Sequence, residues 1–157
     1  MKEILANIAE NVAGEFLALA IGVIATALYS YFRNKSRIAG IGRGRLTSSP
    51  DHKRVASEAN GEIYVIDKAG VRNVTNHPAL DEVVVWSPDS KLIAFVSKRD
   101  NDWQVWAVEV DTRKVVRLTE MQGGPRPIGW DDEGNLIVRL GGSSLTIWKH
   151  EIKKRLA

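Results

Sequence analysis

The side chains that could carry chemistry are few and lie far apart in the chain. Metal binding needs ligands at a fixed spacing, yet His52, His77 and His150 each stand alone. The lack of cysteine excludes a thiolate metal site, a disulfide and a cysteine nucleophile. Asp100-Asn101-Asp102 begins like a calcium loop but lacks its glycine and distal glutamate, so it indicates a hairpin turn. We therefore expect neither a metal nor a cofactor.

Nucleophilic catalysis has equally little support. Ser87, Ser97, Ser143 and Ser144 lack the strand–turn–helix context in which a nucleophilic serine is activated. The sequence predicts no catalytic residues, and we expect a protein that is not an enzyme.

Four side chains could instead contact a ligand or a partner. Trp103 follows a run of charged residues and has no counterpart in the repeats described below; packing in the core or at an edge is its alternative role. Lys98, Arg99 and Arg126 could line a pocket, which would favour a small anionic ligand.

The basic charges that make the pI about 9.3 are concentrated in one short segment. Residues 33–55 carry seven basic side chains and one acidic, whereas residues 56–157 carry 14 basic and 15 acidic. No aromatic platform or recognition element accompanies this segment, so a nucleic-acid polymer is not the expected partner. We expect the segment to set membrane topology and attract anionic lipid head groups. The residues concerned are Arg33, Lys35, Arg37, Arg43 and Arg45.

An apolar stretch precedes this basic segment. Residues 16–32 contain no charge, and residues 12–32 contain only Glu15, which gives a helix of about 30 Å, the thickness of a bilayer core. Residues 1–32 therefore predict an uncleaved transmembrane helix, with a helix buried in a soluble core as the alternative. The basic C-terminal flank places the N-terminus outside and the rest in the cytoplasm. We expect a single-pass protein of the cell inner membrane, with residues 33–47 as a linker.

Small residues recur every four positions along this predicted helix. Such a ridge lets two helices approach closely in lipid, where packing and not hydrophobic burial drives association. The ridge predicts a homo-oligomer whose helices touch at Gly14, Ala18, Gly22 and Thr26.

The rest of the chain repeats with a period of 42–44 residues. Trp86 matches Trp130, and Leu92-Ile93 matches Leu136-Ile137. A third, degenerate copy aligns residues 49–56 with residues 87–94. The next strand aligns residues 63–66 with 105–108 and with 147–150, which makes Trp106 and Trp148 equivalent blade-packing residues. Self-similarity at this period indicates an array of structural units.

Each unit is predicted to be antiparallel. In the best copy, alternating β-branched and aromatic stretches separated by turn residues predict strands over 83–86, 92–97, 104–110 and 115–118. Four strands repeating every 40–45 residues are typical of a propeller blade. The predicted fold is an all-β domain over residues 48–157, with about three blade-like antiparallel units, preceded by the single transmembrane helix.

The motifs of this domain resemble the TolB-like propeller repeat. The resemblance rests on Val74-Thr75-Asn76, Trp86-Ser87-Pro88-Asp89, residues 93–100 and Arg117-Leu118-Thr119. It is specific over residues 74–120, extends more loosely over 48–157 and does not cover the predicted helix. It implies a binding scaffold, since no part of the chain matches the peptidase domains fused to some members. Propellers need at least four blades to close, and about three blades would leave exposed edges. Either several chains complete a ring, or the repeats form a smaller β domain that pairs its edges across subunits, and both routes predict oligomers.

Two functions fit these features. The first is a membrane-anchored, homo-oligomeric binding module that faces the cytoplasm and serves as an interaction scaffold or sensor. The second is a ligand-gated membrane effector of antiviral defence, in which a small molecule such as a nucleotide second messenger rearranges the helices. A basic pocket would favour the second, and flat apolar blade surfaces would favour a protein partner.

Overall fold

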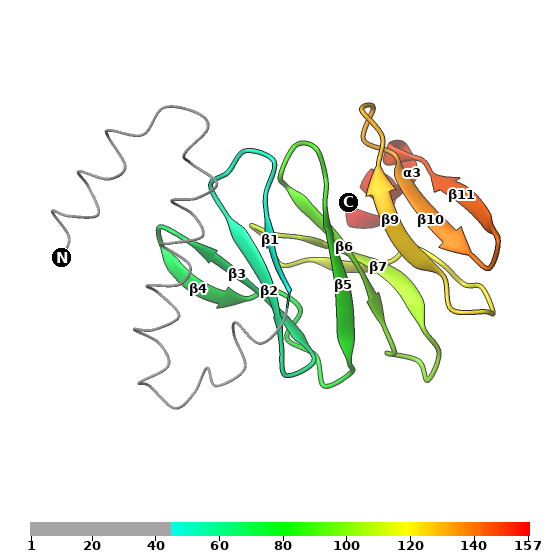
Figure 1. Ribbon diagram of the computed structural model, residues 1–157, viewed down its shortest axis with the longest axis horizontal. Helices are drawn as coiled ribbons and strands as arrows, with labels where there is room; N and C mark the ends of the chain where they lie inside the picture. Colours follow the sequence, from blue (N-terminus) through cyan, green and yellow to red (C-terminus); the bar gives the residue numbers. More distant parts are fainter. Residues whose placement is uncertain (1–44) are drawn as a thin grey trace, which may run out of the picture. The chain divides into compact units, whose positions relative to one another are not determined.

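A computed structural model describes residues 45–157, which form three antiparallel sheets and one helix (Figure 1). Sheet 1 contains β1 (Leu46–Ser48), β2 (Val55–Ala59), β3 (Glu62–Asp67) and β4 (Gly70–Asn73). Sheet 2 contains β5 (Asp81–Trp86), β6 (Leu92–Ser97), β7 (Gln104–Glu109) and β8 (Val115–Arg117). Sheet 3 contains β9 (Arg126–Trp130), β10 (Leu136–Leu140) and β11 (Ser143–Ile147), and is followed by α3 (Lys149–Leu156).

The all-β architecture and the repeating antiparallel units are confirmed. Each sheet is ordered as its strands follow in the chain, so short hairpins connect all neighbours. The four strands predicted for the best copy correspond to β5–β8 within two residues at either end. Sheet 3 differs from the prediction because α3 follows its third strand where a fourth strand was expected.

Two hydrophobic cores join the three sheets. The first core lies between sheets 1 and 2 and includes Ile63, Val65, Trp86, Ile93 and Phe95. The second lies between sheets 2 and 3 and includes Val96, Val105, Leu136, Val138 and Ile152. Sheet 2 contributes to both cores because successive side chains of a strand point to opposite faces. Its central strands β6 and β7 are accordingly buried on both faces over most of their length, as the unbroken apolar run 92–96 in β6 indicates.

The turn between the first two strands of each sheet has the same construction. The side chain of its first residue accepts a hydrogen bond from a backbone amide at the start of the next strand or one residue before it. The three bonds are Ser49 Oγ with Arg54 N (3.0 Å), Ser87 Oγ with Leu92 N (2.9 Å) and Asp131 Oδ1 with Asn135 N (2.7 Å). The third repeat, which lacks the Ser-Pro-Asp motif, therefore keeps the turn because the Asp131 carboxylate replaces the serine hydroxyl.

The alignment of the third repeat needs two corrections. In sheet 2, Trp86 pairs with Ile93, whereas in sheet 3 Trp130 pairs with Leu136. Leu136 and not Ile137 is therefore the counterpart of Ile93, because, counted between these paired residues, the turn between β9 and β10 is one residue shorter than the turn between β5 and β6. In the next strand, Ile147 pairs with Leu136 just as Val108 pairs with Ile93. Ile147 therefore corresponds to Val108 and not to Val105, so the alignment of residues 147–150 with 105–108 is displaced by three residues. The cause is the hairpin after β10, which contains only Gly141-Gly142, whereas six residues connect β6 to β7.

Trp148 consequently does not occupy the position of Trp106. It precedes α3 with 51% of its surface exposed, whereas Trp106 is partly buried against the first core. The prediction that both residues pack within blades was therefore wrong for Trp148.

The predicted transmembrane helix, its ridge of small residues and the basic residues Arg33–Arg43 lie outside the described residues. Within residues 45–157, α3 has eight residues and no helix is long and apolar enough to span a bilayer.

Candidate binding cleft

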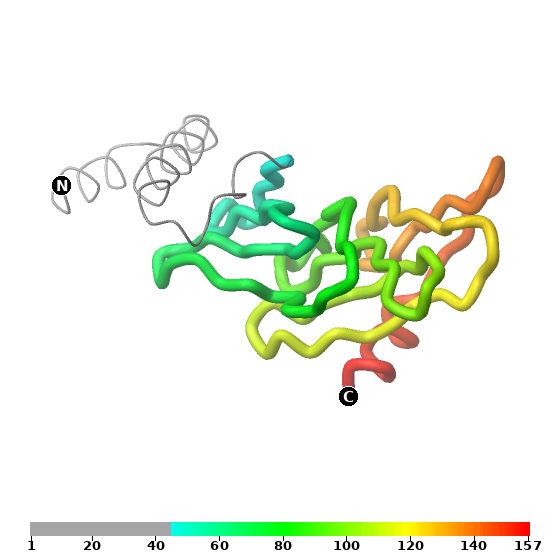
Figure 2. Tube along the Cα trace, turned by 90° about the horizontal axis from the view of Figure 1, so that it is seen from below, coloured from blue at the N-terminus to red at the C-terminus, as the bar shows by residue number. Residues whose placement is uncertain are grey.

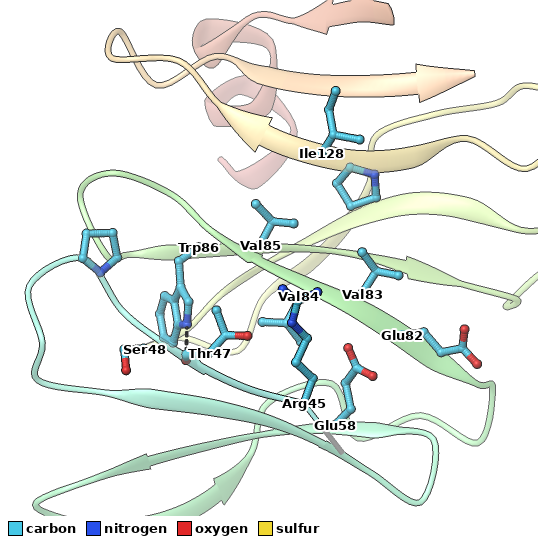
Figure 3. A pocket seen from close by; sticks show the side chains of 12 residues that line it. Arg45, Thr47, Ser48, Glu58, Glu82, Val83, Val84, Val85, Trp86 and Ile128 are labelled. Carbon is cyan, nitrogen blue, oxygen red and sulfur yellow. Dashed lines mark hydrogen bonds between the residues drawn. The ribbon is translucent and has the colours of Figure 1, made fainter. Parts of the chain in front are cut away.

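A cleft of about 600 Å³ is lined by the first strand of each sheet (Figure 3). Strand β1 contributes Thr47 and Ser48, β5 contributes residues 82–86, and β9 contributes Pro127 and Ile128. These strands lie at the same edge of their sheets, and β5 contacts both β1 and β9. In a closed propeller the strands at this edge surround the central axis. The cleft therefore lies where three neighbouring blades of a closed propeller would face its axis.

Two tryptophans connect the strands around the cleft by hydrogen bonds. Trp86 Nε1 donates to the carbonyl of Thr47 at 3.0 Å, and Trp130 Nε1 donates to the carbonyl of Val85 at 3.2 Å. Each indole thus reaches from the first strand of one sheet to the first strand of the sheet before it. The sequence match between Trp86 and Trp130 reflects this repeated contact between sheets.

Strand β5 has a strained bulge in the cleft wall. Its pairing with β6 shifts between Glu82 and Val85, and Val83 within that shift has φ +59°. A β-branched residue with positive φ is unusual, and such conformations cost about 1–3 kcal/mol. Strain of this kind concentrates at ligand sites, where the surrounding structure maintains it. Among residues 45–157, Val83 is the only β-branched residue with positive φ.

Strand β9, which packs beside β5, carries a second bulge. Its pairing with β10 shifts at Ile137–Val138, and Ile128 lies within this irregularity with 46% of its surface exposed. Bulges bend a strand and redirect its side chains, and they are frequent next to binding sites. An exposed isoleucine in a cleft offers an apolar contact to a ligand.

The charged groups of the cleft are Arg45, Glu58 and Glu82. None of these three forms an ion pair with another described residue. Two carboxylates against one guanidinium leave the cleft with a formal charge of −1. The cleft can therefore accept a basic group from a ligand beside an apolar one.

The four predicted ligand contacts are not part of this cleft. Arg99 is turned inward, where it donates to Asp81 Oδ2 at 3.1 Å and to Ser97 Oγ at 3.1 Å. Its guanidinium also lies 5.1 Å from the Trp106 ring centroid. Both partners in the Arg99–Asp81 pair are almost fully buried, so this arginine joins structural elements.

The other three predicted contacts lie outside the cleft as well. Lys98 is exposed in the loop after β6, and Arg126 is exposed at the start of β9. Trp103 is partly buried and packs against the second core, in the packing role that the sequence left open. Arg45, predicted to contact lipid head groups, is the predicted site residue that does line the cleft.

The isolated histidines and the acidic loop have structural surroundings. His77 Nδ1 accepts from the amide of Ala79 at 3.1 Å, and His52 occupies the turn after β1 with φ +57°. Residues 100–102 form part of the connection between β6 and β7, where Asp102 accepts from the amide of Trp103. Across residues 45–157 no three acidic or histidine side chains gather as a metal site would require.

Sequence reasoning did not find Glu58, Glu82, Val83 or Ile128. Pro127 within a strand was an available signal, because proline in a sheet is confined to edges and bulges. The bulge at Val83 has no comparable signal, since valines favour regular strands. Glu58 and Glu82 come from different sheets, and only the packing of β2 against β5 brings them to one cleft.

Comparison with known proteins supports the fold. No family model and no curated protein sequence matches the chain. Among solved structures, TolB of Acinetobacter baumannii is 27% identical with a TM-score of 0.52, covering 68% of this chain and 29% of that protein. A TolB-type protein of Agrobacterium tumefaciens is 22% identical with a TM-score of 0.53, covering 67% of this chain and 49% of that protein. The tricorn protease is 20% identical with a TM-score of 0.50, covering 55% and 10%.

These likenesses support a TolB-like β-propeller segment over about two thirds of the chain. The matched part makes up less than half of either TolB structure, in keeping with three sheets where a whole propeller has more. A shared fold does not determine a function, so any ligand has to be inferred from the residues of the cleft itself.

Proposed function

We propose that this TolB-like propeller segment is a binding module, without an enzymatic role, that holds an extended protein segment in the cleft between β1, β5 and β9. The observation that carries the proposal is the strained bulge at Val83 in a cleft of about 600 Å³. Together with residues 1–32, the module would be a membrane-anchored scaffold or sensor facing the cytoplasm.

The cleft favours a particular ligand chemistry. Glu58 and Glu82 attract a lysine or arginine side chain, while Val84 and Ile128 offer apolar contacts. A small anionic ligand has less support, because Arg99 is engaged by Asp81 and is not available to form a pocket with Lys98 and Arg126. Among the two functions that the sequence left open, the geometry therefore favours the protein-binding scaffold.

The proposed oligomer would associate through residues 1–32. A ring in which sheet 3 of one copy packs on sheet 1 of the next would need an apolar outer face on sheet 3. The face of sheet 3 opposite the second core instead exposes Arg139, Ser144 and Thr146. Continued blade packing through that face is unfavourable, because it would desolvate these polar groups. Contact through Gly14, Ala18 and Gly22 avoids this cost.

Peptide selection on the purified full chain tests the binding proposal. A display library of random peptides should yield sequences in which a lysine or arginine adjoins an apolar residue. Replacing both Glu58 and Glu82 by glutamine should lower the affinity for the selected peptides about tenfold, which corresponds to a loss of about 1.4 kcal/mol of binding free energy. Glu120→Gln is the matched control, because Glu120 is exposed and does not line the cleft. Selected peptides that bind the double variant as tightly as the original chain would rule out the cleft as the peptide-binding site.

Membrane extraction tests the anchor separately. The full chain should stay in the membrane pellet at alkaline pH, and replacement of Ile21 and Ile24 by lysine should release it, since lysine is costly in the middle of a bilayer. Leucine at the same two positions is the control. Release of the unmodified chain would contradict the anchor and would leave the binding cleft unaffected.

A further inference from the structure

Two segments that are distant in the sequence form one strongly basic surface, which we call the rim patch. It comprises residues 113–117 and α3 (149–156), with seven basic side chains and one acidic, Glu151. The basic members are Arg113, Lys114, Arg117, Lys149, Lys153, Lys154 and Arg155. Lys149, in the first turn of the helix, also lies close to Gly134 and to the Asp89 carboxylate. Residues 56–157 are close to neutral as a whole, and the fold brings two of their basic stretches together.

Helix α3 creates the rim patch by packing beside β8. Ile152 is 1% exposed and Leu156 is partly buried, and both pack against the second core. The Lys114 ammonium donates to the carbonyl of Leu156, and Arg155 Nη1 donates to the carbonyl of Arg117 at 2.8 Å. These bonds hold the C-terminal turn of α3 against residues 113–117.

Most of the charge on the rim patch is available to a partner. Arg113, Lys153 and Lys154 are exposed and form no ion pair with any residue between 45 and 157. Arg117 forms an ion pair with Asp100, but this pair is weak because the Asp100 side chain is 61% exposed to solvent. Uncompensated cations gathered on a surface attract anions over roughly a Debye length, about 8–10 Å.

The rim patch and the cleft occupy opposite edges of the domain. Strand β5 lines the cleft, and β8 is the last strand of the same sheet. Figure 2 shows the same arrangement, with α3 in red on the far side of the domain from β1 in cyan. A partner bound to the rim patch would leave the cleft open.

We propose that the rim patch binds the anionic head groups of a membrane surface. The patch complements that surface in charge, and its basic side chains lie along the outer strand of sheet 2 and the helix beside it. Trp148, half exposed where α3 begins, is the residue type that favours the membrane–water interface. The proposal rests on the membrane attachment proposed above, which would keep the domain close to lipid.

Nucleic acid fits the rim patch less well. Binding a single strand needs aromatic side chains on which successive bases can stack. Trp148 is the only aromatic residue among the large apolar side chains exposed in residues 45–157. A single indole beside a helix supplies no such series.

Site-specific quenching in nanodiscs tests the proposal on the full chain. The chain has no cysteine, so His150→Cys places a single fluorophore on the rim patch and Ala69→Cys places one at the turn between β3 and β4. Quenchers attached to lipid should quench the label at 150 several-fold more in anionic than in zwitterionic nanodiscs. The label at 69 should show a smaller difference. Lys153→Glu with Lys154→Glu, or high salt, should remove most of the effect at 150.

Lys53→Glu with Lys68→Glu is the matched control, since it makes the same charge change at exposed lysines outside the rim patch. Equal quenching at 150 in both kinds of nanodisc would overturn the proposal. Quenching at position 150 that persists after Lys153 and Lys154 are replaced by glutamate would also overturn it. The same holds if a soluble oligonucleotide, and not anionic lipid, changes the fluorescence of the label at position 150.

Failure of the anchor would appear separately, as a full chain that does not enter nanodiscs. The same labelled chain would then be mixed with preformed vesicles. Quenching at position 150 by anionic vesicles alone would support the rim patch, and equal or absent quenching by both vesicle types would refute it.

Discussion

The indole nitrogen of Trp86 and the carbonyl oxygen of Thr47 are joined by a 3.0 Å hydrogen bond between the first strands of sheets 2 and 1. Trp86 is 6% exposed and also contributes to the first core. A single side chain therefore links two sheets by both packing and hydrogen bonding. The equivalent bond from Trp130 to Val85 joins sheets 3 and 2.

Replacing Trp86 by phenylalanine should destabilise the domain by about 1 kcal/mol for the lost hydrogen bond, with a further cost for the smaller ring. Trp86→Ala should cost about 3–5 kcal/mol. Trp148→Phe, at a half-exposed position, should change the free energy of unfolding by less than about 0.5 kcal/mol. Denaturant unfolding of the three variants measures these differences, and equal effects at positions 86 and 148 would contradict the assigned contacts.

Arg99 should be important for folding and not for ligand binding. Arg99→Met leaves the Asp81 carboxylate buried without its cation, which typically costs about 3–5 kcal/mol. A double variant that also carries Asp81→Asn should recover part of this loss, because the remaining buried group is neutral. Thermal unfolding of the two single variants and the double variant measures the coupling. Additive losses would show that the two side chains do not interact.

The strain at Val83 predicts an unusual tolerance to glycine. Glycine adopts positive φ without steric cost, so Val83→Gly should recover about 1–3 kcal/mol of strain that offsets the packing it loses. Val85→Gly has no such compensation, since Val85 is absent from the residues with positive φ. Unfolding experiments should therefore show Val83→Gly to be less destabilising by at least about 1 kcal/mol. The reverse order would argue against a strained bulge.

The aspartates of the repeated turns predict a loss of stability in acid. Hydrogen bonds from Ser49 hydroxyl and from the Lys53 amide lower the pKa of Asp51 against its desolvation. Desolvation opposes the pKa shift of Asp89, but bonds from Ser87 and the Lys91 amide outweigh it and lower that pKa as well. A lowered pKa in the folded state contributes stability above the unfolded value of 3.8, and this contribution disappears as the pH falls through the folded value.

Unfolding midpoints measured from neutral pH downward should therefore decline below about pH 4. Asp89→Asn should be less stable than the original chain at neutral pH and should lose less stability on acidification. An unchanged pH profile in this variant would show that Asp89 does not contribute to the acid sensitivity.

The small-residue ridge predicts which substitutions disrupt the oligomer. Gly22→Ile inserts a branched side chain where two helices are expected to touch, so it should weaken association in detergent. Val23→Ile, one position away and off the ridge, should leave association unchanged. Light scattering of the solubilised chain reports the number of subunits. An oligomer that persists with Gly22→Ile would exclude the ridge as the contact.

The repeated tryptophans, the turn motifs and the alternation of β-branched residues were sufficient to predict three antiparallel units and the strands of sheet 2. These features are local, because a strand and its turn depend on residues only a few positions apart. The third repeat was aligned less accurately because Gly141-Gly142 shortens its hairpin, and similarity of residue type does not reveal loop length. Trp148 was consequently assigned to a position that Leu145 occupies.

The cleft and the rim patch could not be predicted in this way. Glu58 and Glu82 come from different sheets, and residues 113–117 meet α3 only after sheets 2 and 3 have packed together. Arg99 showed the same limit: its charge suggested a ligand contact, and the fold placed it against Asp81. Residue type and spacing determine which local units form, whereas the packing of those units decides which charges are neutralised, which remain exposed and which lie together, because these depend on distances between residues far apart in the chain.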